Sequence, residues 1–262
     1  PLPFVTINTV GPALMDWASE DIKQCFLPGI AAGETHFAIG YTEPNAGTDL
    51  AALGTTAVKD GEYWVVNGTK VFTSGAEGAD YVWLAARTDT DAPKHKGITM
   101  FIMDAKDPGF TVAPIHTVGG FRTNMTYYEN VRIHESMVVG EVNKGWHLIT
   151  AQLNHERVGL AAWGIQGWKL FTRTLEWARS TERDGVRVID DPSTQALLAE
   201  AYNRLEAMRV LNARMAWELD QGNLSPALAS GLKVYSTEGL IEIVRLLMEA
   251  IGPASLVQAD ST

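Results

Sequence analysis

Glu156 is the only charged residue on one face of a predicted helix, a face on which apolar residues recur at helical spacing. Steps of three and four residues place one set on a single helix face: Ile149, Leu153, Glu156, Leu160, Trp163, Gly167 and Leu170. A carboxylate directed at an apolar interior is costly unless it is paired or protonated. Burial would raise its pKa toward the range that a proton-abstracting base needs. The residues alone leave two interpretations open, a general base or a structural carboxylate paired with an Arg of another helix.

A second stretch that could bind a ligand runs from Gly40 to Leu50. An apolar lead at residues 37–39 predicts a strand, and Pro44 and Gly47 predict a turn after it. Thr48 and Asp49 are residue types that cap a helical start, here a short turn at residues 50–53. A capped helix start directs backbone N–H groups at one spot, where anions bind. The alternative is an ordinary strand, turn and helix.

The rest of the sequence predicts three regions that would position these residues. Residues 1–34 read as helical, with a capped start at Ser19 and an end at Gly33. Short strands are predicted at residues 55–59, 62–66, 70–73, 81–87, 98–103, 111–115 and 125–133, with hairpin turns at residues 60–61 and 67–68. Strands without intervening helices indicate an antiparallel sheet or barrel. Residues 146–180, 192–221 and 225–251 predict three long helices, most of a bundle.

Composition excludes several classes of function. The 46% hydrophobic content is enough for a sizeable core, and the net charge of −10 argues against general nucleic-acid binding. The single Cys25 allows no intrachain disulfide and suits a reducing cytoplasm, and no apolar run is long enough to span a bilayer. The six histidines show no metal-ligand spacing, so no metal site is expected. No glycine-rich nucleotide loop of the Rossmann or P-loop type occurs.

Three motifs together resemble the acyl-CoA dehydrogenase family. Residues 42–49 read TEPNAGTD, similar to the family's flavin-binding signature, and residues 67–75 read NGTKVFTSG, similar to its flavin-packing strand. Residues 120–123 (GFRT) and 130–133 (NVRI) resemble the segment that closes its β domain. The resemblance covers nearly the whole chain. It implies an α+β multidomain fold: the end of an N-terminal helical domain at 1–35, a middle antiparallel β domain at 36–140 and an incomplete C-terminal helical domain at 141–262.

The same resemblance implies an FAD site and assigns its residues. The positions of Tyr41 and Thr42 meet the isoalloxazine ring in the family, and those of Gly47 and Thr48 meet the pyrophosphate. The residues expected on the strand that packs against the ring are Phe72, Thr73 and Ser74. Phe72 replaces the family's usual Trp, which keeps an aromatic face and loses the indole N–H donor.

For catalysis, the resemblance favours the first interpretation of Glu156. Residues 154–157 (NHER) align with a family segment in which one branch carries its catalytic Glu immediately before an Arg. The commoner branch places its base on a later loop, beyond residue 262. Glu156 would remove the α proton of an acyl-CoA thioester while the β hydrogen leaves as hydride to the flavin. Residues expected to contact the substrate are Thr48, Asn154, Arg157 and Gly164.

Three glycines near Glu156 bear on substrate size. Gly164 and Gly167, with Gly159, lie in a predicted helix, where each Gly costs roughly 0.5–1 kcal/mol relative to Ala. Something is therefore expected to approach the backbone closely, either a neighbouring helix or a bulky acyl chain. Residues 177–185 resemble actinobacterial dehydrogenases that act on steroid side-chain thioesters.

The resemblance also implies partners. Family members complete a neighbour's flavin site with an Arg-x-x-Phe segment and a Gln-x-x-Gly-Gly segment, and here these read Arg183 to Val186 and Glu249 to Pro253. Glu249 would repel a diphosphate, and Pro253 removes a backbone N–H. We therefore expect a heterotetramer with a related subunit. The alternative is a homo-oligomer in which these two segments have diverged in sequence and flavin is bound through other contacts. Electrons would pass to an electron-transfer flavoprotein. The rival functions are an acyl-CoA oxidase that uses dioxygen and a non-catalytic partner subunit.

Overall fold

The computed structural model describes residues 4–223 and 225–257, and it divides into two compact units, Pro1–Leu153 and Asn154–Thr262. Each unit is described by itself. The boundary falls within α3 (Gly145–Ala161). The division of the chain into domains at residues 35 and 140 remains a prediction.

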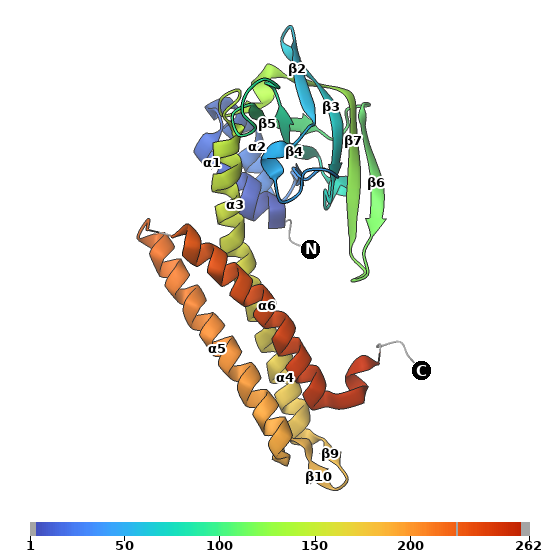
Figure 1. Ribbon diagram of the computed structural model, residues 1–262, viewed down its shortest axis with the longest axis vertical. Helices are drawn as coiled ribbons and strands as arrows, with labels where there is room; N and C mark the ends of the chain where they lie inside the picture. The colour runs from blue at the N-terminus through green and yellow to red at the C-terminus, as the bar shows by residue number, and fades with distance from the viewer. Residues whose placement is uncertain (1–3, 224, 258–262) are drawn as a thin grey trace. The chain divides into compact units, whose positions relative to one another are not determined.

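The first unit begins with helices, as expected (Figure 1). A π-helical turn (Thr6–Val10) leads into α1 (Gly11–Trp17), and α2 (Glu20–Ala32) follows. The Ser19 hydroxyl accepts a hydrogen bond from the Ile22 N–H, and Gly33 ends the helix in the left-handed conformation at φ 74°. The predicted cap and end of α2 are therefore confirmed.

A sheet forms the centre of the first unit. Its strands are β1 (Phe37–Gly40), β2 (Thr56–Asp60), β3 (Tyr63–Val71), β4 (Tyr81–Arg87), β5 (Ile98–Asp104), β6 (Phe110–His116), β7 (Arg122–His134) and β8 (Val138–Val139). Their order is β6-β7-β3-β2-β4-β5-β8, with β1 beside β4. The sheet is mainly antiparallel, but β1 runs parallel to β4, and β2 meets β4 in parallel at Thr56 and Arg87. The predicted antiparallel sheet is confirmed for most strand pairs, and these parallel pairings are the exceptions.

Strands β4 and β5 are buried on both faces, which explains their nearly continuous apolar sequence. Alternate residues face two cores. One core lies between the sheet and the helices α1, α2 and the start of α3. It includes Trp83, Ala85, Met100 and Ile102. The opposite face, with Leu84 and Phe101, packs against side chains of β3 and β7.

The dipeptide Asn67-Gly68 lies inside β3, opposite a bulge in β7, and the prediction of a hairpin turn there was wrong. The β3–β7 register shifts between Val66 and Gly68. The Asn67 carboxamide oxygen accepts the Asn130 N–H at 2.9 Å, which holds the bulge in place. A Cβ on Gly68 would lie 2.7 Å from the Thr55 Cα, so only glycine fits this close approach. The predicted hairpin between β2 and β3 is confirmed, but its turn is Gly61-Glu62, because Asp60 still pairs with Tyr63.

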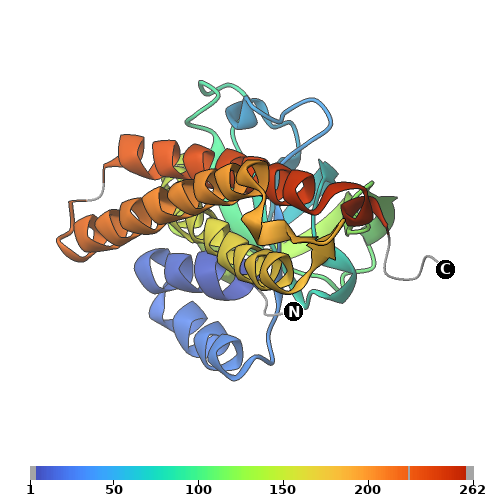
Figure 2. The same cartoon turned by 90° about the horizontal axis from the view of Figure 1, so that it is seen from below.

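The second unit is helical (Figure 2). It comprises α4 (Gln166–Ser180), α5 (Pro192–Asp220) and α6 (Pro226–Ile251), with a two-stranded hairpin, β9 (Glu182–Arg183) and β10 (Val186–Arg187), after α4. Its core includes Phe171, Leu205, Met208, Ile243 and Leu247. The predicted helices at 192–221 and 225–251 are confirmed. No helix in the described part of the chain is long and apolar enough to cross a membrane.

The predicted helix at 146–180 is interrupted, so its apolar stripe is not one face. A 3₁₀ turn (Ala162–Ile165) separates α3 from α4 and changes the angular spacing of side chains there. Trp163 and Leu170 are consequently exposed, whereas Gly167 is buried. The stripe prediction was wrong beyond Leu160.

The glycines in this region meet a neighbouring helix. A Cβ on Gly164 would overlap the Met208 sulfur of α5, and one on Gly167 would lie 2.9 Å from a Leu205 methyl group. The Met208 methyl also approaches Gly239 of α6. Helix α5 is therefore the neighbouring helix that the packing explanation requires. A substrate-binding role of Gly164 remains a prediction.

We expect Gly164→Ala to lower the free energy of unfolding by about 1–3 kcal/mol, because the added methyl group overpacks the site of Met208. In a double-mutant cycle with Met208→Ala, the combined cost should be less than the sum of the single costs. Gly231→Ala on α6, where a Cβ meets nothing within 4 Å, is the control and should not destabilise. Urea unfolding measures all four variants. Additive costs, with activity lost only on bulky acyl-CoA substrates, would instead favour the acyl-pocket explanation.

Candidate active site

The turn after β1 is closed by its own backbone. Glu43 and Ala46 exchange two hydrogen bonds of 3.1 Å across Pro44 and Asn45. The expected helical turn is a three-residue 3₁₀ turn, Leu50–Ala52, and the Asp49 side chain does not cap it. Asp49 instead forms an ion pair of 2.7 Å with Lys94. The predicted cap by Asp49 was therefore wrong, and a single short turn aligns few N–H groups, so anion binding by Gly47 and Thr48 remains a prediction.

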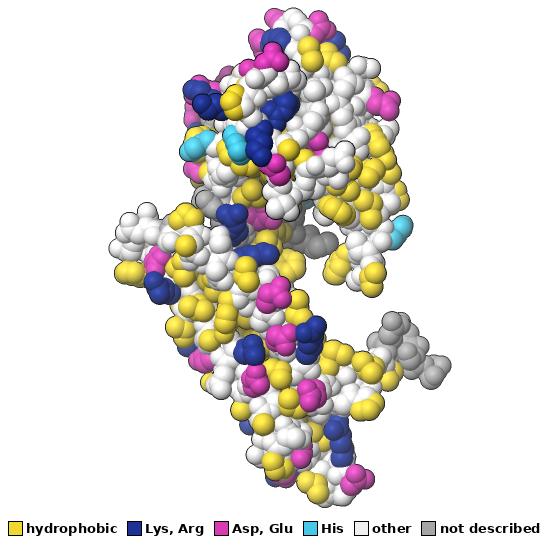
Figure 3. All heavy atoms as spheres, viewed as in Figure 1, with side chains coloured by type: hydrophobic (Ala, Val, Ile, Leu, Met, Phe, Trp, Pro, Cys, Tyr) yellow, Lys and Arg dark blue, Asp and Glu magenta, His cyan; other side chains and the backbone are white. Residues whose placement is uncertain are grey.

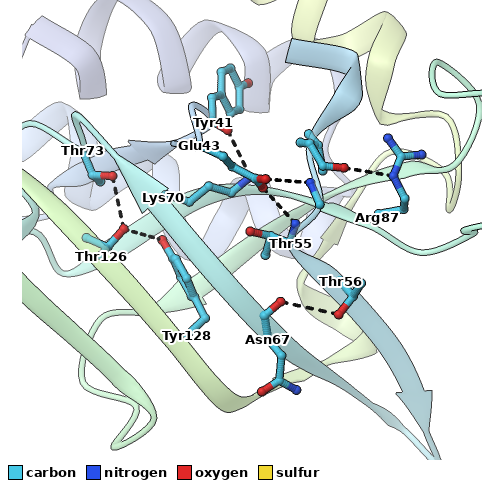
Figure 4. A network of polar contacts seen from close by, with 12 residues as sticks. Tyr41, Glu43, Thr55, Thr56, Asn67, Lys70, Thr73, Arg87, Thr126 and Tyr128 are labelled. Atoms are coloured by element: carbon cyan, nitrogen blue, oxygen red, sulfur yellow. Dashed lines mark hydrogen bonds and ion pairs between the residues drawn. The ribbon is translucent and has the colours of Figure 1, made fainter. Parts of the chain in front are cut away.

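A buried ion pair ties this turn to β3 (Figure 4). The Lys70 amine is fully buried and lies 2.8 Å from a Glu43 carboxylate oxygen. The Glu43 carboxylate also accepts the N–H groups of Gly54 at 2.6 Å and Thr55 at 2.9 Å. One carboxylate thus joins β3 to both ends of the turn.

The two charges have opposite consequences for protonation. Burial lowers the pKa of Lys70 to about 8, although Glu43 opposes this effect, and the charge of Arg87 lowers it further. Burial acts to raise the pKa of Glu43, but the charge and hydrogen bond of Lys70 and the bonds from Gly54 and Thr55 leave this pKa below its usual value. Arg87 is fixed by the carbonyl oxygens of Leu53 and Ala51, at 3.0 and 2.6 Å.

The end of β3 presents Phe72 outward. Its backbone has a φ of 59°, a left-handed conformation that is costly for an aromatic residue, and its side chain is 62% exposed. Hydrogen bonds hold the residues on either side: Val71 N–H to the Thr42 carbonyl at 2.8 Å, and Thr73 N–H to the Asn124 carbonyl at 2.9 Å. An exposed aromatic face is thereby fixed beside the turn of residues 41–54.

The other residues expected to bind the cofactor differ in how accessible their side chains and backbone are. The Thr73 hydroxyl is buried against the Thr126 hydroxyl at 3.2 Å, whereas Ser74 is exposed and its hydroxyl lies 3.0 Å from that of Thr123. Gly47 and Thr48 are exposed, and a Cβ on Gly47 would meet nothing within 4 Å. Phe72, Ser74, Gly47 and Thr48 are thus accessible, whereas the side chain of Thr73 serves the fold.

A second buried polar group holds Tyr41. Its hydroxyl hydrogen-bonds to the Gln152 carboxamide oxygen, and the Trp83 indole N–H lies 2.9 Å from both oxygens. All three side chains are buried. The Gln152 amide nitrogen has no hydrogen-bond partner among the described residues. Tyr41 is therefore fixed by its side chain.

Glu156 lies in the second unit, in the part of α3 that follows Leu153. The side chain is partly buried, and burial raises its pKa, although the charges of Arg157 and Lys233 act to lower it. This direction agrees with the expectation from sequence. No salt bridge of Glu156 with another described residue is found, so the alternative of an Arg partner has no support there. The side chains of Asn154 and His155 lie outside the described residues.

Arg183 is already engaged within the second unit. Its guanidinium donates to the Ile251 carbonyl and lies over the Trp177 ring at 5.3 Å from the centroid. The two segments that resemble a neighbour's flavin contacts therefore lie side by side.

Sequence reasoning missed Lys70, Gln152 and Trp83 as site-building residues. The sequence did contain a signal for Lys70. Alternate residues of a strand face the same side, and Lys70 lies an even number of residues after Trp64 and Val66, which are buried. A lysine at an inward position requires a buried acceptor, and Glu43 is the acidic residue of the other motif.

Glu43→Gln should lower the free energy of unfolding by about 3 kcal/mol at pH 7, because the change leaves Lys70 buried without its counter-charge. Because the pKa of Glu43 is lowered in the folded protein, the stability that its carboxylate contributes is complete above pH 4.5. This stability is lost as the pH falls below 4.5 and the carboxylate takes up a proton. The difference between wild type and variant should therefore narrow from pH 7 to pH 3 in urea unfolding. Glu135→Gln, in the exposed pair with Lys59, is the control and should change little. A constant difference across this range would contradict the assignment.

Known proteins resemble this chain in sequence and in fold. The acyl-CoA dehydrogenase middle domain matches residues 38–131, and the acyl-CoA dehydrogenase C-terminal domain matches residues 143–262. Acyl-CoA dehydrogenase FadE29 of Mycobacterium tuberculosis is 48% identical over 255 residues, which cover 96% of this chain and 65% of that protein.

Two solved structures are similarly close. The Tcur3481-Tcur3483 steroid ACAD matches at a TM-score of 0.94 and 50% identity, covering 99% of this chain and 66% of that one. The ChsE4-ChsE5 complex from Mycobacterium tuberculosis matches at 0.93 and 45% identity, covering 100% and 68%. The chain thus spans about two thirds of the length of these relatives. By these matches, this chain belongs to the acyl-CoA dehydrogenase family.

Proposed function

We propose that the protein is an FAD-dependent dehydrogenase that introduces a double bond between the α and β carbons of an acyl-CoA thioester. The observation that carries this proposal is Glu156, a partly buried carboxylate whose pKa is raised by burial and which has no salt-bridge partner among the described residues. A base of raised pKa retains a proton more firmly after abstraction, as removal of a weakly acidic α proton demands.

The flavin would be held by the turn after β1 and the end of β3. The exposed face of Phe72 suits an aromatic ring, and the uncrowded backbone at Gly47 suits close approach of a phosphate. Ser74 and Thr48 would add hydroxyl donors, with Tyr41 and Thr42 at the ring edge. When bound, the flavin supplies the acceptor for the β hydrogen and passes electrons to an electron-transfer flavoprotein.

We further propose a bulky acyl group, of the steroid side-chain type, as the substrate. Support comes from the 50% identity to a structure named a steroid ACAD. Thr48, Asn154, Arg157 and Gly164 would contact the acyl-CoA. A cytoplasmic location suits such a substrate and remains part of this proposal.

The partner that we propose is a related dehydrogenase subunit in a heterotetramer. Large hydrophobic side chains are exposed on α5 and α6, among them Trp217 at 63% and Val234 at 57%, and Figure 3 shows hydrophobic side chains spread over these helices between charged ones. Such surfaces suit subunit contacts. The replacements at Glu249 and Pro253, together with the engagement of Arg183 by Ile251, make this chain a poor contributor to a neighbour's flavin. The ChsE4-ChsE5 complex is an assembly of two different subunits.

We expect Glu156→Gln to retain flavin and to slow its bleaching by acyl-CoA by about a hundred- to ten-thousandfold, because the amide cannot accept the α proton. In the wild type, the deprotonated carboxylate is the active form. As the pH is lowered, kcat/KM should therefore begin to fall at a pH above 4.5, the ordinary pKa of a glutamate. Stopped-flow absorbance measures both, with the exposed Glu176→Gln on α4 as the control. A near wild-type rate in Glu156→Gln would place the base elsewhere.

For the partner, we expect the chain expressed alone to hold less than one flavin per subunit and co-expression with a related subunit to give one flavin per pair. Flavin absorbance per protein and mass measurement by light scattering report both quantities. A stable homotetramer with one flavin in every chain would exclude the heteromer.

A further inference from the structure

The Lys70 amine has a second contact that the ion pair does not explain. It donates a hydrogen bond of 3.0 Å to the backbone carbonyl of Tyr41. Figure 4 shows the amine reaching both Glu43 and this carbonyl. A fully buried ammonium group therefore lies directly against one peptide bond of the turn.

That peptide bond joins Tyr41 to Thr42. Because resonance couples the carbonyl to the N–H of the same peptide, a cation at the Tyr41 oxygen makes the Thr42 N–H a stronger donor. In the described part of the chain, the Thr42 N–H shows no hydrogen bond, whereas its carbonyl accepts the Val71 N–H at 2.8 Å. The polarised N–H is thus available to a ligand.

We propose that Lys70 is a positioning residue that acts through the Tyr41–Thr42 peptide to favour the reduced form of the flavin. This inference rests on the proposed function. A reduced flavin carries more negative charge at its ring edge than an oxidised one, so a stronger N–H donor there stabilises reduction.

Glu43 does not cancel this effect. Its negative charge is shared among three donors, Lys70 and the N–H groups of Gly54 and Thr55, whereas the positive end of the pair touches the Tyr41 carbonyl. The nearer charge dominates the polarisation of the peptide. Exchange of both partners for neutral residues should therefore still alter the flavin.

The test compares the flavin midpoint potential in the full-length protein, co-expressed with its partner subunit where flavin binding requires it. The variants are Lys70→Met and the double variant Lys70→Met with Glu43→Gln, which avoids an unpaired buried charge. We expect the ratio of reduced to oxidised flavin at a fixed potential to fall about tenfold in both, or about 30 mV for a two-electron couple. Lys59→Met, which removes an exposed lysine of β2, should leave the potential unchanged.

The outcomes separate the inference from the proposed function. A flavin-bearing double variant with the wild-type potential would overturn the inference alone, since the pair would then act only as a structural clamp. A wild-type protein that holds no flavin even when co-expressed with a related subunit would overturn the proposed function and the inference together.

If the double variant does not retain flavin, the wild type provides the test. Lys70, which faces Glu43 and Arg87, has a pKa of about 8. The midpoint potential should therefore fall more steeply above pH 8 than that of unbound FAD. A slope equal to that of unbound FAD would overturn the inference.

Discussion

The turn that carries the expected cofactor contacts depends on one buried ion pair, Glu43 with Lys70. Buried ion pairs are costly to desolvate and contribute little net stability compared with apolar residues of the same volume. One attested role of such pairs is conformational specificity, because a buried charge accepts few alternative arrangements. Here the carboxylate satisfies an ammonium group and two backbone N–H groups at once, so the turn between β1 and β2 has one conformation that fulfils all three.

The two motifs that resemble the family are therefore one structural feature. Glu43 belongs to the first and Lys70 to the second, 27 residues later, and the Val71 N–H joins the same two segments through the Thr42 carbonyl. Arg87 adds a third strand, since it binds the carbonyl groups that end the turn. Side-chain contacts from β3 and β4 thus hold a loop that has little regular structure of its own.

The sequence predicted the helices, most strands and the direction of the Glu156 pKa, because these depend on periodicity and burial that are local in the chain. It failed at Asn67-Gly68, where a hairpin signal is overruled by pairing of β3 with β7 and by the contact with Thr55. It also failed at residues 162–165, where a 3₁₀ turn interrupts the helical period. Both positions make long-range contacts, strand pairing at Asn67-Gly68 and the close approach of Gly164 to Met208, which no local pattern contains.

Phe72 illustrates how such long-range contacts create a functional surface. A left-handed backbone in an aromatic residue costs of order 1–3 kcal/mol and persists only where neighbours over-determine it. The hydrogen bonds of Val71 to Thr42 and of Thr73 to Asn124 fix the chain on either side, and the Thr73 side chain is anchored to Thr126. The side chain of Phe72 must then point outward, where it is 62% exposed. An aromatic residue that would gain by burial is thus held at the surface, next to the turn that Glu43 and Lys70 fix, and a ring stacked on it would recover the lost apolar contact.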